Sequence, residues 1–219
     1  MLRDTLLAFR DGLDDRVGAE MAATIRQADE RLRASGIAAQ ALGEGDIAPD
    51  FTLAAADGGH VRLHEQLSAG PVVLVFYRGG WCPFCSLSLR AYDQIAGAVR
   101  KHGGSIIGVG LERPERARDT AETHRISFPL LWDEGLQTAE QFGLGYDLEP
   151  GMRTMYQRCG HDIPLLSGTG AWRLPMAATF VIAPDGRIVR AMVDSSVYRR
   201  MEPADALAAV VQLSATVSA

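Results

Sequence analysis

The chain has 219 residues, of which 47% are hydrophobic and 22% are charged, with a formal net charge of −5 at pH 7. This is the composition of a globular protein, and the acidic balance without a basic stripe argues against nucleic acid as a partner. No apolar run approaches the ~20 residues of a membrane span, and no signal peptide is recognisable, so we expect a cytoplasmic protein with no membrane partner.

The N-terminal region is predicted to be helical and amphipathic over residues 1–36. It places Met21, Ile25 and Leu32 among polar residues, and Gly36 is a suitable end for a helix. We assign residues 1–40 to a helical N-terminal extension that packs on the domain or on a partner subunit. Residues 41–219 form the domain itself.

The middle of the chain alternates strands and helices. Residues 45–53 lead into a short strand, and a Gly-rich turn joins it to a second hairpin arm at residues 61–63. The further predicted elements are strands at 71–77, 105–110 and 128–132, and helices at 86–101, 114–125 and 137–142. Residues 144–173 have weak periodicity and are predicted to be a long irregular excursion.

The C-terminal part is predicted to be a β-hairpin followed by a helix. The hairpin spans residues 179–193 around Pro184-Asp185-Gly186, and the helix runs from Glu202-Pro203 to about Leu213. The element order predicts an α/β protein with three layers, a mixed sheet and an N-terminal β-hairpin.

A CxxC motif, Trp81-Cys82-Pro83-Phe84-Cys85, lies where the 71–77 strand turns into the next helix. Unpaired N–H groups and the helix dipole stabilise a thiolate at such a place, and CxxC motifs lower thiol pKa values to roughly 3.5–7.5. With only three cysteines in the chain, the pair is more readily catalytic or metal-binding than a structural disulfide.

Four segments of the chain resemble the alkyl hydroperoxide reductase/thiol-specific antioxidant group, the peroxiredoxins. They are Gly45-Asp-Ile-Ala-Pro-Asp-Phe-Thr-Leu53, Phe76-Tyr-Arg-Gly-Gly-Trp-Cys-Pro-Phe-Cys85, Ile126-Ser-Phe-Pro-Leu-Leu-Trp-Asp133 and Ala178-Thr-Phe-Val-Ile-Ala-Pro-Asp-Gly186. The second is similar to the subgroup called peroxiredoxin-like proteins. The resemblance extends from about residue 40 to the C-terminus.

The resemblance implies a thioredoxin-like three-layer α/β/α sandwich and the activity of a thiol peroxidase. The expected substrate is hydrogen peroxide or an organic hydroperoxide, and the expected electron donor is a thioredoxin-like dithiol. It implies no metal and no organic cofactor, and it suggests a homodimer.

The resemblance also assigns roles to the two cysteines. Aligned with the peroxiredoxin motif, Cys85 is the attacking thiol, and Cys82 would resolve its sulfenic acid as a disulfide. Aligned with the thioredoxin motif, Cys82 is the attacking thiol of a disulfide reductase. A third interpretation is a non-catalytic redox-sensing module, in which the motif controls a partner interaction.

The residues around the motif are the supporting candidates. Trp81 is predicted to be a wall of the site beside Tyr77, and Pro83 restricts the backbone between the cysteines. Ala177 occupies the position where peroxiredoxins commonly have an arginine and thioredoxins a proline. Arg78 is therefore our first candidate for the cationic partner of the thiolate, with Arg153 and Arg173 as further candidates.

The remaining reactive residues have weaker patterns. Cys159 precedes His161 closely, so a zinc site with the CxxC pair and a role as a distal resolving cysteine are two alternatives. The sequence favours a buried or incidental thiol over both. Asp194, Tyr198 and Arg200 belong to an ending that fits the peroxiredoxin-like subgroup, and two roles stay open for them: covering the active site or holding the C-terminal helix in place. The other histidines, His60, His64, His102 and His124, do not pair with a cysteine in sequence.

Overall fold

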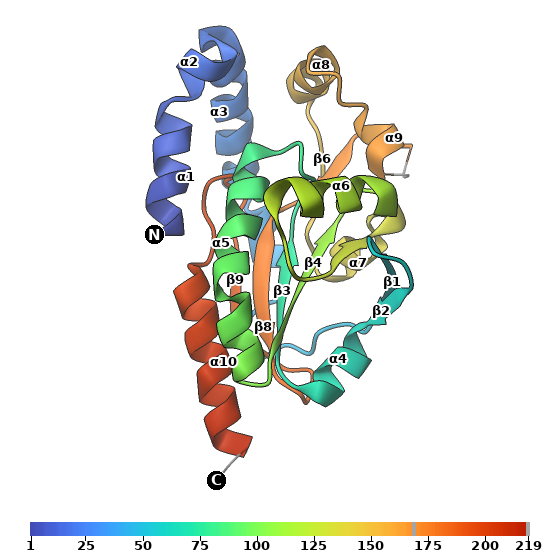
Figure 1. Ribbon diagram of the computed structural model, residues 1–219. Coiled ribbons are helices and arrows are strands. Elements are labelled where there is room, and N and C mark those ends of the chain that lie inside the picture. The colour runs from blue at the N-terminus through green and yellow to red at the C-terminus, as the bar shows by residue number, and fades with distance from the viewer. Residues whose placement is uncertain (168–169, 218–219) are drawn as a thin grey trace.

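The computed structural model describes residues 1–167 and 170–217, and it shows a central sheet with helices on both faces (Figure 1). The sheet has seven strands in the order β2-β1-β5-β4-β3-β8-β9. Strands β3, β4 and β5 are parallel, whereas β1, β8 and β9 pair antiparallel with their neighbours. The strands are Thr52–Ala55 (β1), His60–Arg62 (β2), Val72–Phe76 (β3), Ser105–Gly110 (β4), Leu130–Trp132 (β5), Ala178–Ile182 (β8) and Ile188–Val193 (β9). The predicted mixed sheet with its N-terminal hairpin is confirmed.

Two hydrophobic cores separate three layers. The covering helices are α4 (Leu63–Ala69), α5 (Pro83–Lys101), α6 (Pro114–His124), α7 (Gln137–Gln141) and α10 (Pro203–Val217). Successive side chains of β3 alternate between the faces, so Val73 and Val75 pack with α5, α6 and α10. Leu74 and Phe76 pack on the other face with α4 and α7. Within the described ranges, no helix is long and apolar enough to cross a bilayer.

Two predicted element boundaries are wrong. Helix α5 begins at Pro83 rather than at Ser86, so the second cysteine lies inside the helix. Leu63 begins the unpredicted helix α4 instead of ending the hairpin. With seven residues, α4 contains a single buried i, i+4 pair, Leu63 and Leu67, which is too short a pattern to reveal a helix.

The excursion at residues 144–173 is folded rather than irregular. It contains β6 (Gly145–Asp147), α8 (Pro150–Arg158), α9 (Ile163–Ser167) and β7 (Arg173–Pro175), while residues 168–169 lie outside the described residues. Strand β6 pairs antiparallel with β7. The longest of these elements has nine residues, so none shows a clear hydrophobic period.

The N-terminal region consists of three helices packed on the same core as the sheet. They are α1 (Leu2–Asp11), α2 (Leu13–Val17) and α3 (Ala19–Ala34), and a short 3-10 turn follows. The chain turns at Gly18, whose φ of 82° favours glycine. Leu6 of α1 is fully buried in the cluster of α5 and α10.

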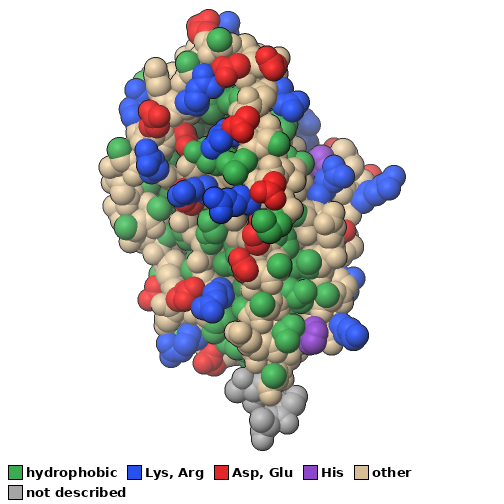
Figure 2. Space-filling view, turned by 90° about the vertical axis from the view of Figure 1, so that its left-hand side faces the viewer, with side chains coloured by type: hydrophobic (Ala, Val, Ile, Leu, Met, Phe, Trp, Pro, Cys, Tyr) green, Lys and Arg blue, Asp and Glu red, His purple; other side chains and the backbone are tan. Residues whose placement is uncertain are grey.

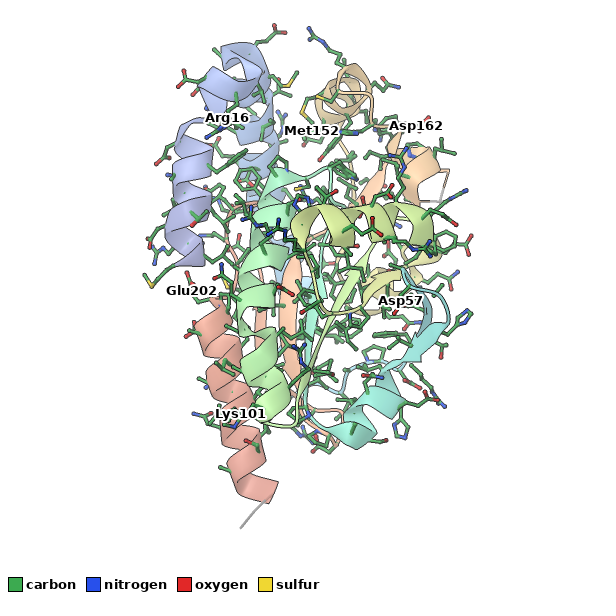
Figure 3. The ribbon with its side chains drawn as sticks, in the orientation of Figure 1. Arg16, Asp57, Lys101, Met152, Asp162 and Glu202 are labelled. Atoms are coloured by element: carbon green, nitrogen blue, oxygen red, sulfur yellow. The ribbon has the colours of Figure 1, made fainter. Side chains whose placement is uncertain are left out.

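Hydrogen bonds at the start of the extension tie it to the segment before α10. The Glu202 carboxylate, labelled in Figure 3 near the start of α1, accepts the N–H groups of Leu2 and Arg3 at 3.0 and 2.7 Å. On the face that carries α1, charged side chains of both signs are interspersed with hydrophobic ones (Figure 2). The division into residues 1–40 and 41–219 stays a prediction.

Candidate active site

The two cysteines of the CxxC motif occupy different positions at the start of α5. Cys82 is the N-cap residue, and Pro83 is the first helical residue, where its missing N–H sacrifices no hydrogen bond. The Cys82 carbonyl accepts the N–H groups of Cys85 and Ser86 at 2.9 and 3.0 Å. Cys85 thus lies in the first helical turn, at the positive end of the helix dipole.

Both sulfurs are shielded from solvent. Cys82 is 6% exposed and Cys85 is 1% exposed, and both are free thiols. Cys82 is the more exposed of the two, as its place nearer the helix start predicted, but it is also buried. A small peroxide can reach such a pair more readily than a folded protein can.

The surroundings favour a thiolate on Cys85 and a thiol on Cys82. A hydrogen bond from the Cys82 thiol, the charges of Arg200 and Arg78, and the backbone N–H of Arg78 lower the pKa of Cys85 to about 6, although burial opposes this. The hydrogen bond to Cys85 and burial together raise the pKa of Cys82 well above its usual range. The proton of the pair therefore stays on Cys82.

Arg78 lies beside the cysteines, where the sequence predicted a cationic partner. It is 4% exposed, and its backbone N–H points at Cys85 Sγ at 3.5 Å. Its Nε donates to Pro175 O at 3.4 Å, and its guanidinium lies 5.5 Å from the centre of the Tyr146 ring. An arginine remains charged even when buried, so Arg78 keeps a positive charge next to both sulfurs.

Arg200 is a second buried cation, whose charge beside Cys85 the sequence did not predict, although covering the active site was one of its two possible roles. It is 9% exposed, and its Nη1 donates to the carbonyl oxygens of Ser196, at 3.0 Å, and Arg199. Its Nη2 is buried and has no hydrogen-bond partner among the described residues. Burial lowers the pKa of Arg200, and the nearby Cys85 opposes that shift.

Arg200 thus supplies a positive charge near Cys85, which the buried Ala177, at the position where peroxiredoxins commonly have an arginine, cannot supply. The resemblance of this ending to the peroxiredoxin-like subgroup indicated Arg200 but not its action on Cys85, since it approaches that cysteine only through the fold of the segment before α10. Asp194 helps to organise this segment by accepting Ser196 N–H at 2.8 Å and pairing with Arg199 at 3.2 Å.

The two other candidate arginines do not serve the cysteines. Arg153 donates from Nε to Leu148 O at 2.6 Å. Arg173 forms ion pairs with Glu140 at 2.7 Å and Asp147 at 3.2 Å. Both are engaged within the 144–173 region and its neighbour α7, so their proposed role beside the thiolate is wrong.

The aromatic residues flanking the motif have different environments. Tyr77 is 1% exposed, and its ring fills the space above Gly110, where a Cβ would lie 2.6 Å from the ring. Trp81 packs edge-on against Tyr156, with centroids 5.4 Å apart, and against His161 at 5.0 Å. Tyr77 is therefore a core residue, whereas Trp81 connects the motif to the region of α8.

A buried carboxylate, also missed from the sequence, lies beneath the loop before Cys82. Glu112 is 6% exposed, and its Oε2 accepts the Thr120 hydroxyl at 2.9 Å. Burial raises the pKa of Glu112, while hydrogen bonds from the Gly80 N–H and from Thr120 oppose that shift. Because Ser86 Oγ also donates to Gly80 O at 2.9 Å, the peptide groups on both sides of Gly80 are held.

Cys159 lies apart from the buried pair. It is exposed at the C-terminal end of α8, and the neighbouring His161 stacks on Trp81. In the described part of the chain, no group of three or more His, Cys, Asp or Glu residues is arranged to hold a metal ion. The structure thus does not assemble the Cys-His set that was weighed as a zinc site.

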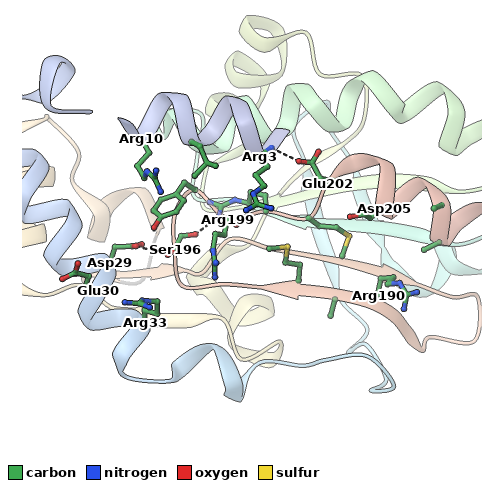
Figure 4. A pocket seen from close by; sticks show the side chains of 18 of the residues that line it. Arg3, Arg10, Asp29, Glu30, Arg33, Arg190, Ser196, Arg199, Glu202 and Asp205 are labelled. Carbon is green, nitrogen blue, oxygen red and sulfur yellow. Dashed lines mark hydrogen bonds between the residues drawn. The ribbon is translucent and has the colours of Figure 1, made fainter. Parts of the chain in front are cut away.

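A broad groove of about 1130 Å³ lies between the N-terminal helices, β9 and α10 (Figure 4). Arginines from several elements surround it, including Arg3 and Arg10 of α1 and Arg33 of α3, and carboxylates such as Asp29 are interspersed. Arg200 lines the groove as well as approaching Cys85. This side of the site is therefore wide and polar.

Comparisons with known proteins agree with the site geometry. Residues 45–191 match the AhpC/TSA family. The chloroplastic peroxiredoxin Q of Triticum aestivum is 31% identical over 127 residues, which are 57% of this chain and 58% of that protein. Peroxiredoxin Bcp of Escherichia coli K12 is 33% identical over 103 residues, 47% of this chain and 65% of that protein.

A similar solved structure is that of the peroxidoxin BcpB from Mycobacterium tuberculosis. It superposes with a TM-score of 0.61 at 25% identity, and the match covers 78% of this chain and 97% of that one. The chain spans 58% and 65% of the lengths of the two curated relatives. The family match does not include residues 1–44.

Proposed function

This chain belongs to the AhpC/TSA family, and on that premise we propose that it is a thiol peroxidase in which the Cys85 thiolate attacks a hydroperoxide. The observation that carries the proposal is the electrostatic asymmetry of the pair. Cys85 lies in the first turn of α5, with the Arg78 N–H directed at its Sγ at 3.5 Å and the buried Arg78 and Arg200 beside it. These groups lower the pKa of Cys85, whereas the pKa of Cys82 is raised. A nucleophilic cysteine requires such a depressed pKa.

The reaction proceeds in two steps that use both sulfurs. The Cys85 thiolate attacks the terminal oxygen of the hydroperoxide, the O–O bond breaks, and Cys85 becomes a sulfenic acid while the alkoxide takes up a proton. Cys82 then attacks the Cys85 sulfur, which forms the disulfide and releases water. The two thiols thus supply the two electrons that reduce the peroxide.

Arg200 is placed to assist the first step. Its guanidinium is buried and interacts with Cys85. Negative charge that develops on the leaving oxygen would pair with it. Preorganised donors of this kind stabilise a transition state without reorganising during the reaction.

A thioredoxin-like dithiol is the proposed electron donor that reduces the Cys82–Cys85 disulfide. The proposal also includes a cytoplasmic location and a homodimer. The name of the Triticum aestivum relative, by contrast, places that protein in the chloroplast. No metal and no organic cofactor enters these steps.

The cysteine variants test the assignment. After a slight excess of hydrogen peroxide, trapping and mass spectrometry are expected to find sulfenic acid on Cys85 in the Cys82→Ser protein. Cys159→Ser is the matched control and should retain turnover. Sulfenic acid found only on Cys82 of the Cys85→Ser protein would overturn the assignment, and wild-type reactivity no faster than that of a peptide thiol would overturn the peroxidase.

A disulfide reductase with Cys82 attacking is the second candidate. Its support is the position of Cys82 at the N-cap, where it is the more exposed sulfur. Turnover of insulin disulfides without peroxide turnover would favour it. Redox-dependent partner binding without turnover of either substrate would favour the redox-sensing module.

A further inference from the structure

The N-terminal extension makes direct hydrogen bonds to the segment that carries Arg200. Asp29 of α3 accepts the Ser196 hydroxyl at 2.9 Å and the Val197 N–H at 3.2 Å, one with each carboxylate oxygen. Figure 4 shows the first of these bonds as a dashed line at the edge of the broad groove. The partners are 167 and 168 positions apart in the chain, so the two bonds fix α3 and this segment relative to each other.

Every polar group of Ser196 has a partner. Its N–H donates to Asp194 at 2.8 Å, its hydroxyl donates to Asp29, and its carbonyl accepts Arg200 Nη1 at 3.0 Å. Ser196 is 2% exposed, so little water can replace these bonds. One buried residue therefore connects the Asp29 carboxylate to the Arg200 guanidinium.

The guanidinium held in this way acts on Cys85. Arg200 is buried, and its charge helps to lower the pKa of that cysteine. An arginine side chain has many rotamers, so its charge stays in one place only where acceptors hold the guanidinium. The acceptors here are the carbonyls of Ser196 and Arg199. The adjoining groove of about 1130 Å³ gives the guanidinium room to leave the sulfur when the segment loosens.

The charge of Asp29 has an effect of the opposite sign. The charged groups that face Asp29 are Arg78, which also lies beside Cys85, and Asp194. A nearby negative charge disfavours a thiolate and raises its pKa. Removing only the charge of Asp29 would therefore lower the pKa of Cys85, whereas loosening Arg200 would raise it. The sign of the shift distinguishes the two effects.

We propose that Asp29 is a positioning residue, which holds the segment of Ser196 so that Arg200 stays beside Cys85. The proposal rests on the peroxidase function proposed above, in which Cys85 is the reacting sulfur. Asp29 and the 194–201 segment both lie outside residues 45–191, so this contact is a feature of the chain beyond its family match. The N-terminal extension thus contributes to the reactivity of the cysteine.

The test measures the pH profile of iodoacetamide labelling at the Cys85 peptide by mass spectrometry. Asp29→Ala removes both hydrogen bonds, and we expect its midpoint to rise by about 1 pH unit, the lower end of the shift that a nearby opposite charge produces. Asp29→Asn removes the charge but keeps a side chain that can bond to both partners, so its midpoint should stay at or below that of the wild type.

The next residue of α3 provides the matched control. Glu30 is exposed and makes no hydrogen bond or ion pair with the described residues, so Glu30→Gln removes the same charge without releasing the segment. Its midpoint should equal that of the wild type. Ser196→Ala removes the hydroxyl and keeps the carbonyl that holds Arg200, and it keeps the test open if Asp29→Ala does not fold. Its midpoint should also rise.

A double-mutant cycle tests whether Asp29 acts through Arg200. Arg200→Met alone should raise the midpoint, and adding Asp29→Ala should raise it no further, because both changes remove the same interaction. A further rise in the double variant would show that Asp29 acts by another route and would contradict the proposal.

Peroxide turnover separates this proposal from the function on which it rests. Well below both midpoints, kcat/KM for hydrogen peroxide should be about tenfold lower in Asp29→Ala, because one pKa unit is a tenfold change in the thiolate fraction. A midpoint in Asp29→Ala and Ser196→Ala at or below that of the wild type would overturn the positioning role and leave the peroxidase intact. Failure of the wild type to reduce hydrogen peroxide would instead overturn the proposed function, whatever the labelling midpoints are.

Discussion

At the scale of single residues, the main feature is two positive charges retained inside the protein beside a cysteine. A buried charge is costly unless it is paired, so Arg78 and Arg200 gain most when Cys85 is ionised. The stabilisation is mutual, because the same charges depress the pKa of the thiol. The negative charge of the Cys85 thiolate thus compensates the buried positive charges of Arg78 and Arg200.

The first prediction concerns Arg200. Replacing it with methionine in Arg200→Met keeps the bulk but removes the charge, so the pKa of Cys85 should rise from its value of about 6. Because the thiolate is the reactive form, alkylation of Cys85 should be lost as the pH falls through the pKa. The pH profile of iodoacetamide labelling, read at the Cys85 peptide by mass spectrometry, measures the shift.

A neighbouring arginine provides the control for this prediction. Arg199 is exposed and ion-paired with Asp194, so Arg199→Met should leave the midpoint of the profile in place. Arg200→Lys, which keeps a charge, should restore part of the shift. Identical midpoints for Arg200→Met and the wild type would mean that Arg200 does not act on Cys85.

The sequence could identify the local residues of the site but not the distant ones. Cys82, Cys85 and Arg78 lie together along the chain, so the motif and its family resemblance locate them. Arg200 and Glu112 come from other elements, and only the packing of the segment before α10 and the end of β4 brings them near. Arg153 and Arg173 failed as candidates because carbonyl and carboxylate groups nearer to them take their hydrogen bonds.

At the scale of elements, length decided what the sequence could predict. The buried strands and the long helix α5 have enough residues to show a hydrophobic pattern, so the sequence predicts them. The helices α4, α8 and α9 are short, and tertiary contacts rather than local periodicity stabilise them. The predicted start of α5 is three residues late because the apolar period becomes regular only at Leu87, whereas Pro83 already fits the first helical position.

The second prediction concerns helix α1. Leu6 of α1 is fully buried against α5 and α10, so Leu6→Ala should lower the free energy of unfolding by about 2–5 kcal/mol. Leu165→Ala, the same substitution at an exposed leucine of α9, should change it by less than about 0.5 kcal/mol. Urea denaturation followed by circular dichroism measures both.

The shape of the transition also tests how the chain is divided. If residues 1–40 share the core with the rest, Leu6→Ala should shift one cooperative transition to lower urea. A separate early transition, with the main one unmoved, would show instead that the extension unfolds as an independent unit.

At the scale of the whole molecule, the site is enclosed from two sides by segments outside the sheet. The α3 helix and the 194–201 segment lie on one side, and Trp81 packs against Tyr156 and His161 on the other. A protein reductant needs direct contact with a sulfur, so these surroundings must open before it can react.

This enclosure predicts an unequal reactivity of the three thiols toward a bulky reagent. In the native reduced protein, a polyethylene glycol maleimide should label Cys159 rapidly, because it is exposed, and should label Cys82 and Cys85 slowly, because they are 6% and 1% exposed. Hydrogen peroxide, which is small, should nevertheless oxidise the buried pair. After peroxide treatment and denaturation, one labelled thiol rather than three is therefore expected, as counted by the mobility shift on a denaturing gel.

Cys159→Ser provides the control, since it should show no rapid labelling before denaturation and none at all after peroxide treatment. Labelling of Cys82 as fast as that of Cys159 in the native protein would show that the site is already open, and a protein donor would then need no conformational change to reach it.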